Sequence, residues 1–281
     1  MPYLILTSLI WAFSFPLIKK YLSLYDPSMI SFLRLFISFL VFLPLTKFKN
    51  LSRKHVVKQM LIGVVQFGVM YVLYIKSYQY LKGHQIALLT ITTPVYVVLL
   101  DALFNRKWRP VYWSAAFLTL AGSYTLVDKG AGSVFQLKGV LLVQAANGCF
   151  ALGQILQKKW LHGKLYQIFA WSYLGGLAVP LLTLLLTTQL SPGKIGALLP
   201  TKPISLLVLV YLGVVASGLG FYMWNRGVCM SNAGTVSVMN NLKIPMAILV
   251  SAVIFGELIK WPSLLIGGSC FCLALYWTWE H

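Results

Sequence analysis

Lys243 is a charged residue in an unexpected place, the middle of a long apolar run. It follows Asn240 and Asn241 and precedes Pro245. A charge at the centre of a bilayer costs about 2.5–3.5 kcal/mol, and a proline leaves a backbone carbonyl one turn earlier without its hydrogen bond. An ammonium, two amides and a free carbonyl together suit a carboxylate or a phosphate. The alternative is that Lys243 pairs with a group inside the protein and meets no ligand.

Aromatic residues in other apolar runs could form the walls of a small-molecule pocket. Tyr71, Tyr74 and Tyr78 are three or four residues apart, so they share one face of a helix. Small-molecule sites have apolar walls and a few placed polar groups. The alternative is that these rings only pack, or anchor helices at the membrane surface. Besides Lys243 and its two asparagines, the predicted pocket residues are Trp11, Tyr71, Tyr74, Tyr78, Asn147, Tyr222 and Trp224.

Two more charged residues lie inside apolar runs. Asp101 is the only acidic residue within these runs, and it could carry a coupling proton or pair with Arg106 or Lys107. Arg34 could bind a ligand, or it could extend to the membrane surface or tie helices together. Both residues are therefore candidates for function with a structural alternative.

The sequence offers no pattern for catalysis or for metal binding. Its histidines and cysteines are His55, His84, His162, His281, Cys149, Cys229, Cys270 and Cys272. No cysteine stands at metal-ligand spacing with a histidine, and there is no pair of acids near one membrane face for acid–base chemistry. We therefore expect no catalytic residue, no metal and no cofactor.

The composition indicates a membrane protein. Hydrophobic residues make up 59% of the chain and charged residues 10%, whereas soluble domains carry about 25% charged residues. The net charge of +18 could indicate nucleic-acid binding, but the 23 Lys and Arg residues occur in short groups between apolar runs. Such groups are typical of loops that contact anionic lipid headgroups. We expect membrane lipid as a partner, and no nucleic acid.

The apolar runs predict an all-α integral membrane protein with ten transmembrane helices. A helical span needs about 20 apolar residues, and the runs lack the strict alternation of barrel strands. The predicted spans are 2–18, 28–46, 56–80, 84–104, 110–127, 138–157, 166–187, 203–225, 232–255 and 262–279. With the N-terminus inside, the loops carry twelve Lys and Arg residues on the cytoplasmic side and nine opposite. This bias predicts that both termini are cytoplasmic.

The two halves of the sequence repeat each other. Residues 92–108 match residues 243–259 at an offset of 151, which aligns Pro94 with Pro245. The prediction is two repeats of five spans, at 1–130 and 131–281. Because five is odd, the second repeat enters the membrane from the opposite face, as in alternating-access transporters. Kinks at the two prolines would then serve as hinges.

Several segments, taken in order, resemble a known family. LTSLIWAFSFPLIKK in the first span, FLRLFIS in the second and FGE after the ninth resemble the drug/metabolite transporter superfamily, in its ten-helix branch with two EamA-type repeats. NNLKIPMAILVSAVIFGE further resembles the carboxylate/amino acid/amine transporter group of bacteria. NNLK is also similar to the Asn-Lys pair that sugar-nucleotide carriers of the superfamily place at the ligand. The chain departs from the family after the fourth span, where Asn105 and Arg106 stand for a Gly-Glu pair.

The resemblance implies a secondary active transporter that moves small metabolites across the bacterial inner membrane by alternating access. We expect amino acids or related carboxylates as substrates and export as the direction. Lys243, Asn240 and Asn241 would hold the substrate carboxylate between the two halves. The alternatives are a membrane-embedded enzyme, or a channel or scaffold without carrier activity. A homodimer is left open.

Overall fold

The computed structural model describes most of the chain. The described residues are 1–22, 25–47, 51–77, 79–81, 83–126, 135–160, 165–187, 199–255 and 261–279. Within these ranges every regular element is a helix. Tyr78 of the predicted pocket and the predicted repeat boundary between residues 130 and 131 lie outside the described residues.

The helices form ten membrane-spanning segments, as the sequence predicts. In chain order they are α1 (Pro2–Tyr21); α2 (Pro27–Phe42) with the short η1 (Leu43–Leu45); α3 (Arg53–Gly63), η2 (Val64–Val69) and α4 (Met70–Ser77); α5 (Gly83–Thr90) and α6 (Thr93–Asn105); α7 (Pro110–Leu126); α8 (Leu137–Trp160); η3 (Leu165–Gln167) and α9 (Phe169–Thr187); α11 (Pro203–Tyr211), η4 (Leu212–Leu219) and α12 (Gly220–Cys229); α13 (Ala233–Phe255); and α14 (Trp261–Trp279). Among the described residues, 7 stretches meet the length and hydropathy of a membrane span by composition alone. The chain is thus a multi-pass membrane protein.

Two of the spans contain a π-helical segment near their middle. These segments are η2 in the third span and η4 in the eighth. At the repeat offset of 151, η2 corresponds to residues 215–220, so the two π segments overlap in the repeat. π segments inside helices occur frequently at functional sites. The sequence does not reveal them, because both runs are simply apolar.

The two prolines that the repeat aligns lie in different backbone settings. Pro94 is in the first turn of α6, just after the interruption that separates α5 from α6. Pro245 lies inside α13, which continues as a helix on both sides of it. Only Pro94 therefore accompanies an interruption of its span, and the hinge role of both prolines stays a prediction.

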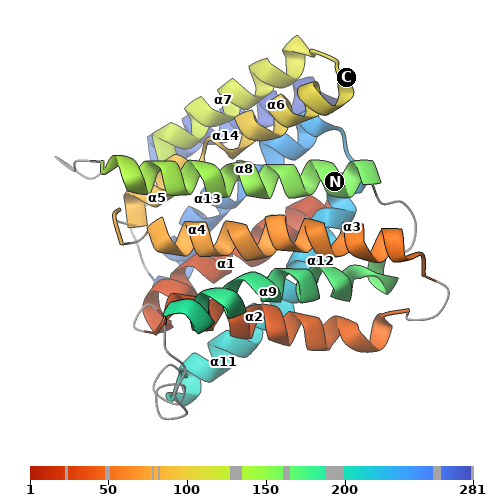
Figure 1. Cartoon of the computed structure of the whole chain (residues 1–281). Helices are drawn as coiled ribbons and strands as arrows, with labels where there is room; N and C mark the ends of the chain where they lie inside the picture. The colour runs from red at the N-terminus through yellow and green to blue at the C-terminus, as the bar shows by residue number, and fades with distance from the viewer. Residues whose placement is uncertain are drawn as a thin grey trace.

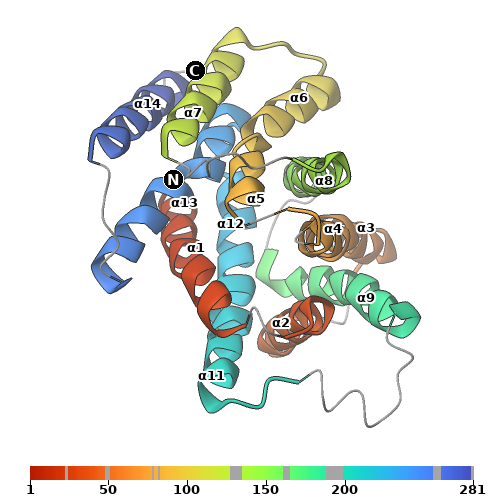
Figure 2. The same cartoon turned by 90° about the vertical axis from the view of Figure 1, so that its left-hand side faces the viewer.

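The two repeats pack into each other rather than side by side. α2, α9, α4 and α8 lie next to one another in a row, with α1, α12 and α13 behind it (Figures 1 and 2). The contacts of α1 with α13, of α2 with α9 and of α4 with α8 each join a helix of the first half to one of the second. α7 and α14 pair with each other at one edge of the bundle (Figure 2). The main core therefore lies between the two halves.

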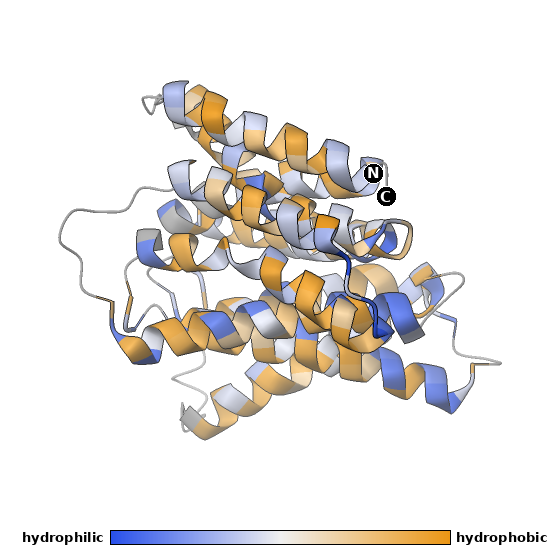
Figure 3. Ribbon diagram, turned by 90° about the horizontal axis from the view of Figure 1, so that it is seen from above, coloured by the Kyte–Doolittle hydropathy of each residue, from blue (hydrophilic) through white to orange (hydrophobic). Residues whose placement is uncertain are grey.

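The ends of the helices carry much of the hydrophilic surface. Figure 3 shows apolar residues along most of the helices and strongly hydrophilic turns gathered toward their ends. The start of α1 and the end of α14 lie at the same end of the bundle (Figures 1 and 3). An even number of crossings requires this arrangement, so it agrees with ten spans.

Candidate substrate-binding site

Lys243 points at aromatic rings from the opposite repeat and from its own. It lies near the middle of α13 and is half-buried. Its Nζ atom is 5.7 Å from the ring centroid of Trp11 in α1 and 5.9 Å from that of Phe150 in α8. Ring faces attract a cation, but they do not neutralise its charge. Among the described residues, no carboxylate or hydrogen-bond acceptor is paired with this amine.

The two asparagines before Lys243 are buried and bonded within the protein. Asn240 exchanges two hydrogen bonds of 3.2 Å with the Gln154 amide of α8 and donates another to the Val236 carbonyl. Asn241 donates at 2.8 Å to the carbonyl of Ile91, in the interruption between α5 and α6. The Asn241 Oδ1 atom is buried and has no hydrogen-bond partner in the described part of the chain. In this arrangement both amides tie α13 to neighbouring spans, whereas the Lys243 amine is not bonded to any of the described residues.

Trp11 connects the lysine to the π segment of the eighth span. Its indole Nε1 donates a 2.9 Å hydrogen bond to the Ala216 carbonyl in η4. Its ring packs against Phe221, at 5.4 Å between centroids, and against Trp224, at 5.0 Å. Trp224 is fully buried. Trp11 and Trp224, both predicted pocket residues, therefore pack against each other, and Lys243 lies over the Trp11 ring.

Arg34 is a second inward-facing cation. It lies in α2 and only 8% of its surface is exposed. Its Nε and Nη2 atoms donate to the Ser217 hydroxyl at 3.2 and 3.0 Å, and its guanidinium carbon is 5.3 Å from the ring centroid of Tyr71. The sequence marks it only as an arginine within an apolar span. Its partner Ser217 lies in the other repeat and carries no signal of its own.

Besides Trp11, side chains from two more helices bond to carbonyls of η4. Ser38 of α2 donates to the Gly213 carbonyl at 2.7 Å. The Tyr173 hydroxyl of α9 is 2.8 Å from both the Ser217 and the Gly218 carbonyl. In a membrane, backbone groups must be satisfied inside the protein. These side chains, which the sequence analysis did not single out, hold the π segment beside Trp11 and Arg34.

Of the predicted tyrosines, the structure describes Tyr71, Tyr74 and Tyr222, and their rings have different neighbours. Tyr71 is half-buried and its ring meets Phe221 edge-on, at 6.1 Å between centroids. Tyr74 packs instead with a separate apolar cluster around Ile86. Tyr222 packs against Phe42, at 5.4 Å between centroids, on the side of α9. Of these three, Tyr71 is the one whose ring contacts both Phe221 and Arg34 in the described part of the chain.

Asn147 and Asp101 lie at two other places in the bundle. Asn147 of α8 donates to the Leu89 carbonyl at 2.9 Å and to the Thr92 hydroxyl at 3.1 Å, so it closes the interruption between α5 and α6. Asp101 of α6 accepts a 2.8 Å hydrogen bond from Asn105, one turn on. It makes no contact with Lys243 within the described part of the chain. Its role in proton coupling therefore stays a prediction, and no contact joins it to Lys243 or Arg34 in the described residues.

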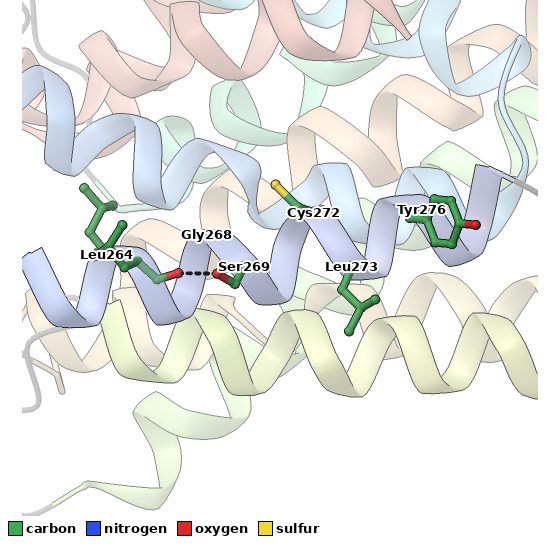
Figure 4. Close-up of a pocket in the computed structure, with 7 residues that line it drawn as sticks. Leu264, Gly268, Ser269, Cys272, Leu273 and Tyr276 are labelled. Atoms are coloured by element: carbon green, nitrogen blue, oxygen red, sulfur yellow. Dashed lines mark hydrogen bonds between the residues drawn. The ribbon is translucent and has the colours of Figure 1, made fainter.

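A groove of about 550 Å³ lies on the outer face of α14 (Figure 4). Its lining residues are Leu264, Leu265, Gly268, Ser269, Cys272, Leu273 and Tyr276. The Ser269 hydroxyl is already bonded to the Leu265 carbonyl at 2.8 Å. None of the predicted site residues lines this groove, so it is separate from the cluster around Lys243.

Comparison with known proteins agrees with this architecture. The sequence matches the EamA-like transporter family over residues 1–127 and 137–279. A crystal structure of another protein superposes with a TM-score of 0.82 at 18% identity, covering 98% of this chain and 96% of that one. This likeness shows the fold alone.

Relatives of similar length have names that state a function. The chain is 34% identical over 286 residues to a biotin transporter of Salmonella typhimurium, covering 100% of this chain and 92% of the relative. It is 35% identical over 283 residues to a biotin transporter of Escherichia coli, covering 99% and 92%. It is 35% identical over 282 residues to a probable biotin transporter of Pseudomonas aeruginosa, covering 98% and 96%. This chain is therefore a membrane transporter, not an enzyme, and belongs to the EamA-like transporter family.

Proposed function

We propose that this protein carries biotin through the membrane by alternating access. Relatives at 34–35% identity over nearly the whole chain are named biotin transporters or probable biotin transporters. The observation that carries the proposal is the amine of Lys243, which lies over Trp11 and Phe150 without an acid or acceptor in the described residues. An amine in that setting is suited to a carboxylate brought by a ligand.

The chemistry of biotin fits the residues around Lys243. Biotin has a carboxylate at the end of a flexible apolar chain and two fused rings at the other end. The carboxylate would pair with the Lys243 amine, and the apolar chain would lie on the aromatic rings of Trp11 and Phe221, which are 5.4 Å apart. A pocket with apolar walls and few polar groups is typical of small-molecule sites.

The charges near Lys243 favour biotin over the amino acids predicted from the sequence. An amino acid brings an ammonium as well as a carboxylate, and the positive charges of Lys243 and Arg34 would repel that ammonium unless a carboxylate lay nearby. Within the described ranges the acids are Asp26 and Asp101. Asp26 caps the start of α2 by accepting from the Met29 amide at 2.8 Å, and Asp101 is bonded to Asn105. The cluster therefore presents two cations, Lys243 and Arg34, and no carboxylate.

Orientation and direction belong to the same proposal. Both termini would lie in the cytoplasm and the protein in the bacterial inner membrane, as the loop charges predict. Export, the direction that the family resemblance implies, stays a prediction, as do the repeat boundary at residue 130 and a homodimer. Uptake of labelled biotin into right-side-out vesicles, compared with inverted vesicles, measures the direction.

Counterflow in proteoliposomes tests the proposal. Vesicles loaded with unlabelled biotin should accumulate labelled biotin through the wild-type protein, because a carrier exchanges its substrate. Lys243→Gln should lower the rate by about 10- to 100-fold, the range expected when a buried charge pair loses one member.

Lys58→Gln is the matched control for this substitution. Lys58 also lies over an indole ring, that of Trp160 at 5.3 Å, but it is in the middle of α3, which contributes none of the proposed binding residues. It should leave counterflow within about twofold of wild type, since it has no part in the proposed contact with the substrate. Absence of biotin counterflow in the wild type would contradict the function, and equal rates in both lysine variants would contradict the role of Lys243.

A further inference from the structure

The two inward-facing cations are linked by a series of contacting aromatic rings that includes Phe221. Phe221 meets Trp11 at 5.4 Å and an interplanar angle of 65°, and it meets Tyr71 at 6.1 Å and 80°. Lys243 lies over the Trp11 ring and Arg34 over the Tyr71 ring. The contacts therefore run from Lys243 to Trp11, Phe221, Tyr71 and Arg34. A ligand that follows these contacts would meet a positive group at each end and apolar rings between them.

Arg34 has more donors than the protein uses. A guanidinium has five N–H groups, and two of its nitrogens, Nε and Nη2, share one acceptor, the Ser217 hydroxyl oxygen. The backbone carbonyls of Ser217 and Gly218 already accept from Tyr173. No carboxylate faces Arg34 among the residues that the structure describes. A cation that is nine-tenths buried is costly unless its remaining donors find acceptors.

Ser217 has an unused donor beside those of Arg34. Its hydroxyl oxygen accepts from the guanidinium, and its own hydrogen has no acceptor in the described part of the chain. Ser217 is fully buried within η4. One uncharged oxygen placed here could accept from both Ser217 and Arg34. A ring carbonyl of high electron density is such an oxygen.

We infer that Arg34 and Ser217 form a second polar subsite, which binds the ureido carbonyl oxygen of the substrate while Lys243 binds its carboxylate. This inference rests on the proposed function. Lys243 takes the charged end because it has no hydrogen-bond partner among the described residues, whereas Arg34 already donates to Ser217. The subsite would make Arg34 and Ser217 specificity-determining residues for the ring end.

Two analogues of biotin separate the two ends in a binding assay on the purified full chain. Biotin methyl ester lacks the negative charge of the carboxylate. 2-Iminobiotin replaces the ureido oxygen with an imino nitrogen that is protonated near neutral pH, so it places a positive charge against Arg34. Wild type should bind biotin about 10- to 100-fold more tightly than either analogue, as for hydrogen bonds to charged groups.

The variants should lose these preferences separately. Arg34→Gln should bring the ratio of biotin to 2-iminobiotin affinity to within about threefold of unity and keep the preference over the methyl ester. Lys243→Gln should remove the preference for biotin over the methyl ester and keep the preference over 2-iminobiotin. Ser217→Ala should weaken the preference over 2-iminobiotin without removing the arginine, so it tests the subsite should Arg34→Gln fail to fold. Arg109→Gln, which removes an arginine that lies 5.0 Å from the Tyr112 ring outside the site, should leave both preferences intact.

The outcomes distinguish this subsite from the proposed function. No biotin binding by wild type would contradict the function itself. Biotin binding with an unchanged preference over 2-iminobiotin in both Arg34→Gln and Ser217→Ala would contradict the subsite alone. Loss of the methyl ester preference in Arg34→Gln, with that over 2-iminobiotin kept, would show that the substrate binds in the opposite direction and would also overturn the inference.

Discussion

At the scale of single residues, the sequence predicts the unusual charges better than their partners. Lys243 and Arg34 are recognisable because charges are rare inside apolar spans. The groups around them come from distant parts of the chain: Trp11 lies over 200 residues before Lys243, and Ser217 is 183 residues from Arg34. The bonded state of Asn240 and Asn241 could not be foreseen either, because it depends on Gln154 and on an interruption near Ile91.

The amide pair between Asn240 and Gln154 should stabilise the packing of α13 on α8. Asn240→Leu leaves the buried Gln154 amide without its partner, so we expect the free energy of unfolding to fall by about 1–3 kcal/mol. Replacing both residues with leucine should be less destabilising than the single change, because no buried polar group is then unpaired. Thermal unfolding in detergent measures both. A double variant that is as unstable as the sum of the single variants would contradict this account.

At the scale of helices, the ten spans follow from hydrophobicity, and the interruptions within them do not. The predicted third span, 56–80, is observed at residues 53–77, but nothing in it indicates that Val64–Val69 is π-helical. The π segments and the interruption before Pro94 depend on partners in other helices, such as Tyr173 and Asn241. The sequence of the segment itself therefore cannot predict these features, because the partners lie far away in the chain.

The contact between α3 and α9 requires glycine at two positions. A Cβ atom on Gly63 would overlap the Ser172 carbonyl, and one on Gly175 would overlap the Met60 carbonyl. An overpacked core typically costs about 1–3 kcal/mol. Gly63→Ala should lower the free energy of unfolding by more than that, because the added Cβ atom would clash with backbone atoms, which cannot move aside as a side chain can. Gly268→Ala is the control, since no atom lies within 4 Å of its added Cβ. Equal melting temperatures of the two variants in detergent would refute the close contact.

At the scale of the whole molecule, the charge distribution explains the membrane class and supports the proposal of an anionic substrate. The chain has 23 Lys and Arg residues against 5 Asp and Glu residues. The described acids lie away from the cluster around Lys243 and Arg34. The charged groups described in this cluster are therefore both positive. The inverted repeat is predictable from the sequence offset, whereas the interlocking of α1 with α13 and α2 with α9 is known only from the structure.

The orientation of the whole molecule makes a separate prediction. Because the start of α1 and the end of α14 lie at one end of the bundle, and loop charge places that end inside, a fluorescent protein fused after the last residue should fluoresce. Alkaline phosphatase at the same position should be inactive. Fusions after Tyr80, between the third and fourth spans, should give the opposite pair of results. The reverse pattern at both positions would contradict cytoplasmic termini.

The most direct test of the central claim is the distance between the Lys243 amine and the biotin carboxylate in a structure of the complex. We predict that Nζ lies about 2.7–2.9 Å from a carboxylate oxygen, the range of charged hydrogen bonds, with the apolar chain of biotin against Trp11 and Phe221. Biotin bound elsewhere in the protein, with the Lys243 amine still facing only aromatic rings, would contradict the account.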